Sequence, residues 1–228
     1  MRRVLDLLPY IALILAGLRY NLLIAASAFL AGFAAAAAAL VLSLSSPAAA
    51  RLVAAASRAV RGVPPLVLIA ATYWLLLPAL GLPSDALLAC TAALAVRTAA
   101  FQVQILRAAA SAVERGQLEA ALALGLSERE AALHVVLPQS MRFALPALFN
   151  ELSSLLKEST LGLAVGVLDA LARARLVSIA TGYSLVWMLA AGLLVYAASW
   201  AVLRLSRLLH RRLAVPGTLG AGVVELWR

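Results

Sequence analysis

Long apolar stretches separated by shorter polar ones run along almost the whole chain. A helix needs about 20 predominantly apolar residues to cross a hydrocarbon core ~30 Å thick. Five stretches reach that length, of which three contain no charged residue and two are interrupted by charged or polar side chains. The predicted spans are residues 22–42, 63–82, 86–106, 146–168 and 184–203. The pattern predicts an all-α integral membrane protein with one transmembrane domain over residues 1–213 and a cytoplasmic tail over 214–228.

The N-terminal stretch 7–18 is apolar but too short for an untilted crossing, and Asp6 and Arg19 bound it. We expect an interfacial helix there, which gives five spans in total. The alternative is a sixth span through residues 4–18, which would move the N-terminus to the other side of the membrane.

The composition supports a membrane protein, because 64% of the residues are hydrophobic and only 13% are charged. Soluble domains are roughly 45–50% apolar and 25% charged. Cys90 is the only cysteine, so an internal disulfide is impossible. His134 and His210 do not have the spacing of zinc ligands, and we expect no metal site.

The formal charge of +9 comes from arginines that flank the apolar stretches. Basic residues favour the cytoplasmic side of a membrane. Placing 51–61, 107–142 and the tail from Arg204 inside puts twelve arginines in the cytoplasm and five outside. Because these arginines do not interleave with aromatics in a soluble domain, we expect membrane lipid around the chain and no nucleic-acid partner. The expected location is the plasma or inner membrane, crossed several times.

Arg51, Arg58 and Arg61 follow the first span at positions i, i+7 and i+10. These positions share one face of a helix. The spacing predicts a helix lying on the membrane surface.

The longest polar segment, 107–142, has the pattern of two short helices joined by a turn. Good helix formers occupy 113–124 apart from Gly116, and Gly125 is a plausible left-handed end. Ser127 and Glu130 have capping-box spacing, which predicts a second helix from Glu128 until Pro138 interrupts it. Such a cytoplasmic helix-turn-helix could fill a groove on a partner, although a solvated loop is the alternative.

Part of this segment resembles the EAA motif of ABC-importer permeases: Glu119-Ala120-Ala121, three residues, Gly125, nine residues, Val135, one residue, Leu137-Pro138. Segments 61–67, 100–107 and 154–161 resemble the polar amino acid branch of that family. The sequence departs from the branch at Gln104, at Ala108-Ala109 and at Glu114. These departures leave the cargo open.

The resemblance implies a type I ABC-importer permease fold, in which two permease subunits pair as a homodimer or heterodimer. Each would present its EAA loop to one subunit of an ABC ATPase dimer, and an extracytoplasmic solute-binding protein would deliver a small molecule, a polar amino acid. The implied coupling residues are Gln117, Glu119, Ala120, Ala121, Gly125, Val135, Leu137 and Pro138. ATP would be bound by the partner, so we expect this chain to hold no cofactor and to be no enzyme. Its only lysine follows Leu156 rather than the glycine of a Walker-type phosphate loop.

Polar residues within the predicted spans are candidates for a translocation path, because unpaired charges are costly in lipid. The fourth span carries most of them on one helix face, and the third carries an arginine near its middle. The candidates are Arg97, Asn150, Glu151, Ser154, Lys157 and Glu158. Arg97 could attract a substrate carboxylate or bind backbone carbonyls, and Lys157 could pair with a carboxylate for structure alone.

The sequence is also compatible with three other functions. One is an ABC permease for another small solute, such as a quaternary amine. Another is an ATP-independent secondary transporter or channel, and a third is an integral membrane enzyme. The chain has no evident internal repeat and no convergent catalytic set, so the importer permease is favoured.

Overall fold

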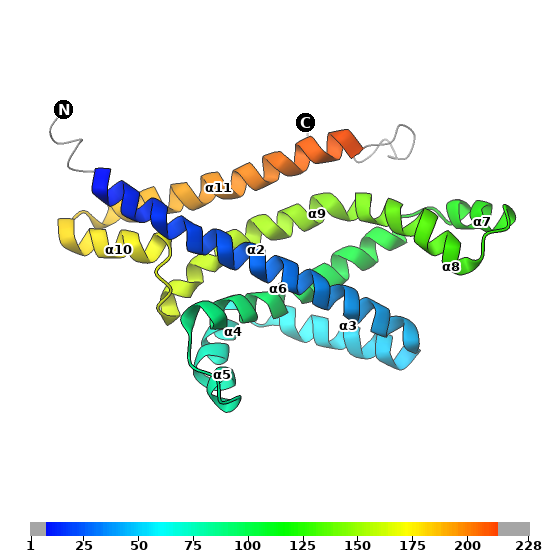
Figure 1. Ribbon diagram of the computed structural model, residues 1–228, viewed down its shortest axis with the longest axis horizontal. Coiled ribbons are helices and arrows are strands. Elements are labelled where there is room, and N and C mark those ends of the chain that lie inside the picture. The colour runs from blue at the N-terminus through cyan, green and yellow to red at the C-terminus, as the bar shows by residue number, and fades with distance from the viewer. Residues whose placement is uncertain (1–7, 214–228) are drawn as a thin grey trace. The chain divides into compact units, whose positions relative to one another are not determined.

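The structure is a computed structural model that describes residues 8–213 (Figure 1). Arg2, Arg3 and the predicted tail 214–228 lie outside the described residues. The described chain is nearly all helical and contains no strand, as predicted. Its elements are α2 Leu8–Ser45, α3 Pro47–Gly62, α4 Pro65–Ala71, η1 Thr72–Leu76, α5 Leu77–Ala79, α6 Ala86–Ser111, α7 Arg115–Ala123, α8 Glu128–Ala131, η2 Ala132–Val136, α9 Leu137–Glu158, η3 Ser159–Val165, α10 Ala170–Thr181 and α11 Ser184–Leu213.

The helices form two compact units. The first comprises the chain up to Gln104 together with Glu151–Ala201, and the second comprises Ile105–Asn150 together with the chain from Val202. α6, α9 and α11 each contribute to both units.

The first helix of the first unit is longer than predicted. The stretch 7–18 is not a separate interfacial helix, because α2 continues without a break to Ser45. Arg19 does not end it, since its side chain is exposed and its guanidinium lies 4.9 Å from the ring centroid of Tyr20. At 1.5 Å per residue, 38 residues extend for ~57 Å, well beyond the thickness of a hydrocarbon core.

Three described helical segments are long and apolar enough to cross a membrane, at 9–45, 86–111 and 184–209. A fourth exists if α3 and the following helix 65–79, which meet at a 98° bend, count together. The arginine-bearing segment 51–61 is helical, as predicted. In the predicted span 63–82, the helical part ends at Ala79. The number of spans stays a prediction.

The predicted fourth span, 146–168, is not one α-helix. α9 begins earlier, at Leu137, and ends at Glu158, where the 3₁₀ helix η3 takes over. Gly166 then stops the helix in the left-handed conformation, with φ of +99°. The polar residues of this stretch therefore lie on the last turns of α9, next to a break in the helix.

Contrary to the prediction, Pro138 does not interrupt the helix. The π-helical turn η2 ends at Val136, and the N–H of Leu137 reaches back to the carbonyl of Ala132. The same arrangement precedes Pro78, where η1 ends at Leu76. A proline lacks an N–H and its ring crowds the preceding turn, and a widened turn is a recognised way to accommodate it.

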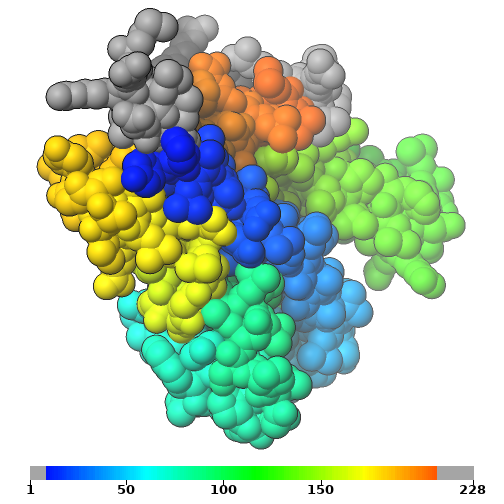
Figure 2. Space-filling model, turned by 60° about the vertical axis from the view of Figure 1, so that its left-hand side comes forward, coloured from blue at the N-terminus to red at the C-terminus, as the bar shows by residue number. Residues whose placement is uncertain are grey.

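The core of the first unit forms where α2, α6 and the end of α9 converge. Its buried apolar side chains include Ile24, Ala28, Ile69, Cys90, Leu94, Leu155 and Leu156. Cys90 is a fully buried free thiol and packs as a small apolar core residue. In the space-filling view, the first turns of α2 lie against the segment that contains α10 (Figure 2).

The contact between α2 and α10 is held by a buried polar network around Asn21. The Asn21 amide nitrogen donates to Ser159 Oγ at 2.9 Å and to Asp169 Oδ2 at 3.2 Å, and its oxygen accepts from the N–H of Ala170. Asp169 also caps α10 by accepting from the N–H of Ala172. Asn21, Ser159 and Asp169 are fully buried, so the network fixes the start of η3 and the start of α10 against α2.

Candidate functional site

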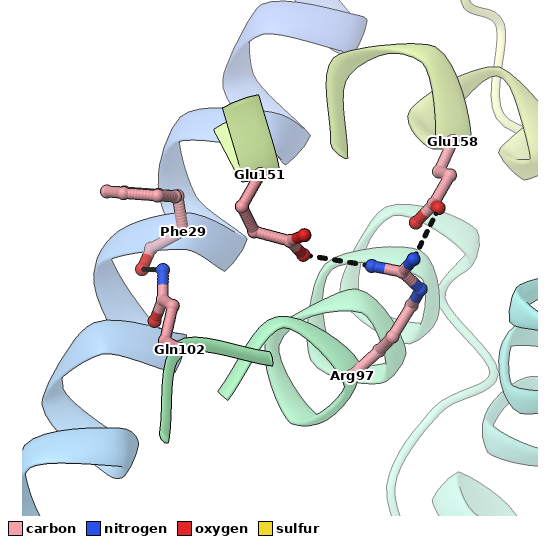
Figure 3. Close-up of polar contacts among 5 residues, drawn as sticks. All are labelled: Phe29, Arg97, Gln102, Glu151 and Glu158. Atoms are coloured by element: carbon pink, nitrogen blue, oxygen red, sulfur yellow. Dashed lines mark hydrogen bonds and ion pairs between the residues drawn. The ribbon is translucent and has the colours of Figure 1, made fainter. Parts of the chain in front are cut away.

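Arg97 lies in the middle of α6 and binds two carboxylates from α9 (Figure 3). Its Nη1 lies 2.9 Å from Glu151 Oε1, and its Nη2 lies 2.7 Å from Glu158 Oε1. The two glutamates are seven residues apart, which places them on one face of α9. We call Arg97, Glu151 and Glu158 the Arg97 clamp, because it joins α6 to the end of α9.

The Arg97 clamp is largely removed from solvent and its charges do not balance. The side chains of Arg97, Glu151 and Glu158 retain 11%, 8% and 20% of their exposure. With all three groups ionised, the clamp carries one excess negative charge. Glu158 Oε2 is buried and has no hydrogen-bond partner among the described residues, so one acceptor of the clamp remains open.

The ring of Phe101 lies beside the clamp on the next turn of α6. The guanidinium carbon of Arg97 is 4.3 Å from its ring centroid, within the range of a cation–π contact. The next residue, Gln102, donates to the carbonyl of Phe29 at 3.3 Å, which ties α6 to α2 (Figure 3). The clamp therefore sits on a helix that is anchored on two sides.

The structure divides the polar face predicted for the fourth span. Glu151 and Glu158 point to Arg97 with half-buried Ser154 between them in sequence, whereas Asn150 and Lys157 are exposed. Lys157 forms no ion pair within residues 8–213. The predicted polar residues do not all share one face of the helix. Residues 150 and 157 each precede residues 151 and 158 by one position, and neighbouring positions of a helix point in different directions.

Sequence reasoning missed Asn21 and the aromatic partner of Arg97. Asn21 is a single amide within an apolar stretch, and a polar side chain at such a position normally has a buried partner. The position of Asn21 could therefore have predicted a buried polar partner. The contact with Phe101 could have been expected from its position four residues after Arg97 on one helix face.

The second unit contains the helix-turn-helix, which we call the EAA hairpin (residues 115–138). α7 ends at Ala123, and Gly125 has φ of +89°, the left-handed conformation that the sequence predicted. Ser127 and Glu130 form the predicted capping box, with the Ser127 N–H donating to Glu130 Oε2 at 2.9 Å. Gln139 also donates to Gln117 at 3.4 Å, joining the two arms.

Most residues of the EAA motif are on the surface of the hairpin. Glu119, Ala120, Gly125 and Pro138 are exposed, along with Gln117 and Leu137, and Val135 is half-buried. Ala121 is 4% exposed and its carbonyl accepts from the N–H of Leu126, so it supports the turn from inside. Large apolar side chains are exposed beside the motif: Leu118, Leu122, Leu124, Leu133 and Leu137. The hairpin thus presents an apolar surface on a turn held by Gly125 and the capping box.

Replacing Ser127 by alanine is expected to loosen the second arm of the hairpin. Removal of a serine N-cap costs about 1 kcal/mol, which corresponds to roughly fivefold faster amide exchange at Glu130 and Ala131, whose N–H groups donate to Ser127. Hydrogen–deuterium exchange of the purified protein measures this, with Ser111→Ala as a control in α6. Equal exchange in both variants would contradict the importance of the cap.

The stabilising effect of this capping box on the hairpin depends on pH. Hydrogen bonds from the Ser127 backbone N–H and hydroxyl lower the pKa of Glu130 below its usual 4.5. The carboxylate therefore stabilises the hairpin above pH 4.5, and this contribution is lost as the pH falls through the lowered value.

The fold and these two sites define a helical membrane protein with a buried charge cluster and a capped, exposed helical hairpin. The model of the family described as "Binding-protein-dependent transport system inner membrane component" matches residues 28–215. The chain therefore belongs to this family of inner-membrane transport components, whose members are permeases and not catalytic subunits.

Individual relatives agree with this assignment. The chain is 38% identical to the probable glutamine ABC transporter permease protein GlnM of Bacillus subtilis (strain 168) over 51% of its length and 54% of that protein. It is 35% identical to the arginine transport system permease protein ArtQ of the same organism, over 60% and 62%. The matches thus span about half the length of the curated relatives.

Solved structures match over most of the chain. A chain from the crystal structure of an amino acid ABC transporter with histidines has a TM-score of 0.84 and 28% identity, over 91% of this chain and 97% of that one. A chain of the MetNI methionine ABC transporter, in an inward-facing conformation, has a TM-score of 0.78 and 21% identity, over 91% and 99%. The predicted ABC-importer permease fold is confirmed.

Proposed function

We propose that this chain is the permease subunit of an ATP-binding-cassette importer for a polar amino acid. The observation that carries the proposal is the EAA hairpin, a capped and exposed turn with apolar residues around an EAA motif. Relatives named as a probable glutamine permease and an arginine transport permease support the amino acid cargo. A second permease subunit and a solute-binding protein would complete the importer.

The hairpin would transmit movement from the ATPase to the helices of the permease. Its turn is fixed by left-handed Gly125 and by the capping box, and α8 continues through η2 into α9. A stiff element of this kind passes on a displacement that a flexible loop would absorb. Exposed Glu119 would make the polar contact with the ATPase, while the leucines around it fill an apolar groove.

ATP would be bound and hydrolysed by the ATPase alone, so this chain has no catalytic role in the proposal. Arg97, Glu151 and Glu158 are proposed to border the translocation path together with Ser154. Exposed Asn150 and Lys157 remain candidates for the part of the path that a second permease subunit would complete.

Replacing Gly125 by valine is expected to uncouple ATP hydrolysis from uptake or to prevent attachment of the ATPase. A β-branched residue resists a φ of +89°, and the left-handed conformation costs about 1–2 kcal/mol for a residue with a β-carbon. The measurements are copurification of the ATPase and amino acid uptake per ATP hydrolysed.

Gly81→Val is the matched control for this experiment. Gly81 is also left-handed, with φ of +69°, and it lies in the turn after α5, away from the hairpin in sequence. We expect Gly81→Val to keep its ATPase and its coupling ratio. If Gly125→Val transported normally, or if both variants were uncoupled alike, the coupling role of the hairpin would be wrong.

A further inference from the structure

Arg61 is a second guanidinium beside the ring of Phe101. It lies in the last turn of α3, where its Nε donates to the carbonyl of Ser57 at 3.4 Å. Its guanidinium carbon is 5.6 Å from the ring centroid of Phe101. Among the described residues, the two terminal nitrogens of Arg61 have no acceptor and the residue forms no ion pair.

The two arginines beside Phe101 differ in whether their guanidinium groups bind a carboxylate. Both terminal nitrogens of Arg97 already bind carboxylates of this chain. Arg61 is half-buried, and its two terminal guanidinium nitrogens have no acceptor among the described residues. A guanidinium that is partly withdrawn from water gains most from a carboxylate, which it binds through two parallel hydrogen bonds.

The charges around Phe101 form a dipole. The guanidinium carbons of Arg61 and Arg97 lie 5.6 and 4.3 Å from the same ring centroid, so they are no more than 9.9 Å apart. Arg61 contributes one positive charge, and the Arg97 clamp beside it has one excess negative charge when both glutamates are ionised. A ligand with a carboxylate and an ammonium group a few ångströms apart matches this arrangement.

We propose that Arg61 binds the carboxylate of a zwitterionic α-amino acid against the ring of Phe101, with its ammonium group toward the Arg97 clamp. This inference rests on the proposed function and deepens it, because it assigns a substrate class to the site. It also separates two tasks: Arg61 recognises substrate, and Arg97 holds α6 to α9. A lipid phosphate is the other anion that could reach Arg61, and the experiment distinguishes the two.

The test is equilibrium binding to the purified permease–ATPase complex in lipid nanodiscs, without the solute-binding protein. The probes are two pairs: L-arginine with agmatine, its decarboxylated form, and L-glutamine with 4-aminobutanamide. The wild-type complex is expected to prefer the amino acid of one pair over its amine. In Arg61→Gln, the affinity for that amino acid should fall at least about tenfold while the amine binds as before.

Two further variants control this result. Arg61→Lys should recover part of the preference, because a point charge replaces a bidentate fork. Arg58→Gln removes an exposed arginine from the same helix and should change nothing. Equal losses for amino acid and amine in Arg61→Gln would indicate a merely structural residue and overturn the proposal.

Three outcomes separate the remaining explanations. If the Arg61→Gln effect appears only in nanodiscs with anionic lipid, Arg61 binds lipid and the proposal is wrong. Uptake is measured separately, in proteoliposomes with the solute-binding protein. If the wild-type complex takes up an amino acid with ATP in that assay but Arg61→Gln keeps the full binding preference, this inference fails and the proposed function stands. A wild-type complex without ATP-dependent uptake in that assay would overturn the proposed function and this inference with it.

Discussion

Replacing Arg97 by methionine is expected to destabilise the first unit by about 3–5 kcal/mol, the usual cost of breaking a buried ion pair. Methionine fills similar space but leaves Glu151 and Glu158 without their common partner. Two carboxylates would then share a mostly buried site with no compensating cation. The measurement is the thermal unfolding midpoint of the purified protein in detergent, followed by tryptophan fluorescence.

Two variants show whether the loss comes from the unpaired carboxylates. Arg58→Met removes an exposed arginine and should leave the midpoint unchanged. A triple variant, Arg97→Met with Glu151→Gln and Glu158→Gln, removes every charge of the clamp and should regain most of the stability. A single Arg97→Met variant as stable as wild type would contradict the clamp.

Replacing Gly17 by alanine is expected to disrupt the packing of α2 against α10. A β-carbon at this position would lie 2.6 Å from the backbone nitrogen of Ala170 and 2.6 Å from the carbonyl of Asp169. Backbone atoms cannot rotate away, so the helices must separate. Overpacking typically costs about 1–3 kcal/mol, and here the shift would also strain the buried hydrogen bonds from Asn21 to Asp169 and Ala170.

Gly192→Ala is the matched control, because Gly192 is helical and its β-carbon would meet nothing within 4 Å. Removing a helical glycine at an open position should raise stability slightly. The unfolding midpoint and the yield of folded protein measure both variants. If Gly17→Ala unfolded at the same temperature as Gly192→Ala, the close approach of α2 and α10 would be wrong.

The features that the sequence predicted well depend on neighbouring residues only. The left-handed Gly125 and the capping box at Ser127 follow from local rules that operate over three or four positions. The all-α fold follows from apolar length in the same way. The EAA spacing then supplied the family, which the match over residues 28–215 confirms.

The features that it predicted poorly depend on distant contacts. A charge at Arg19 suggested a boundary, but that side chain is exposed and Asn21 finds its partners on η3 and α10, so α2 continues. Pro138 suggested an end to the helix, yet a π-helical turn accommodates it. The partners of Arg97 are 54 and 61 residues away in the sequence, and no local pattern brings the middle of α6 against the end of α9.

The central claim is that this chain is the permease of an ATP-driven amino acid importer. Its most direct test reconstitutes the chain with its copurifying ATPase in proteoliposomes, adds the solute-binding protein, and measures uptake of radiolabelled L-glutamine and L-arginine. We predict uptake of at least one of them with internal ATP, and none without ATP or with Gly125→Val. Uptake by the chain alone, driven by an ion gradient without the ATPase, would contradict the account.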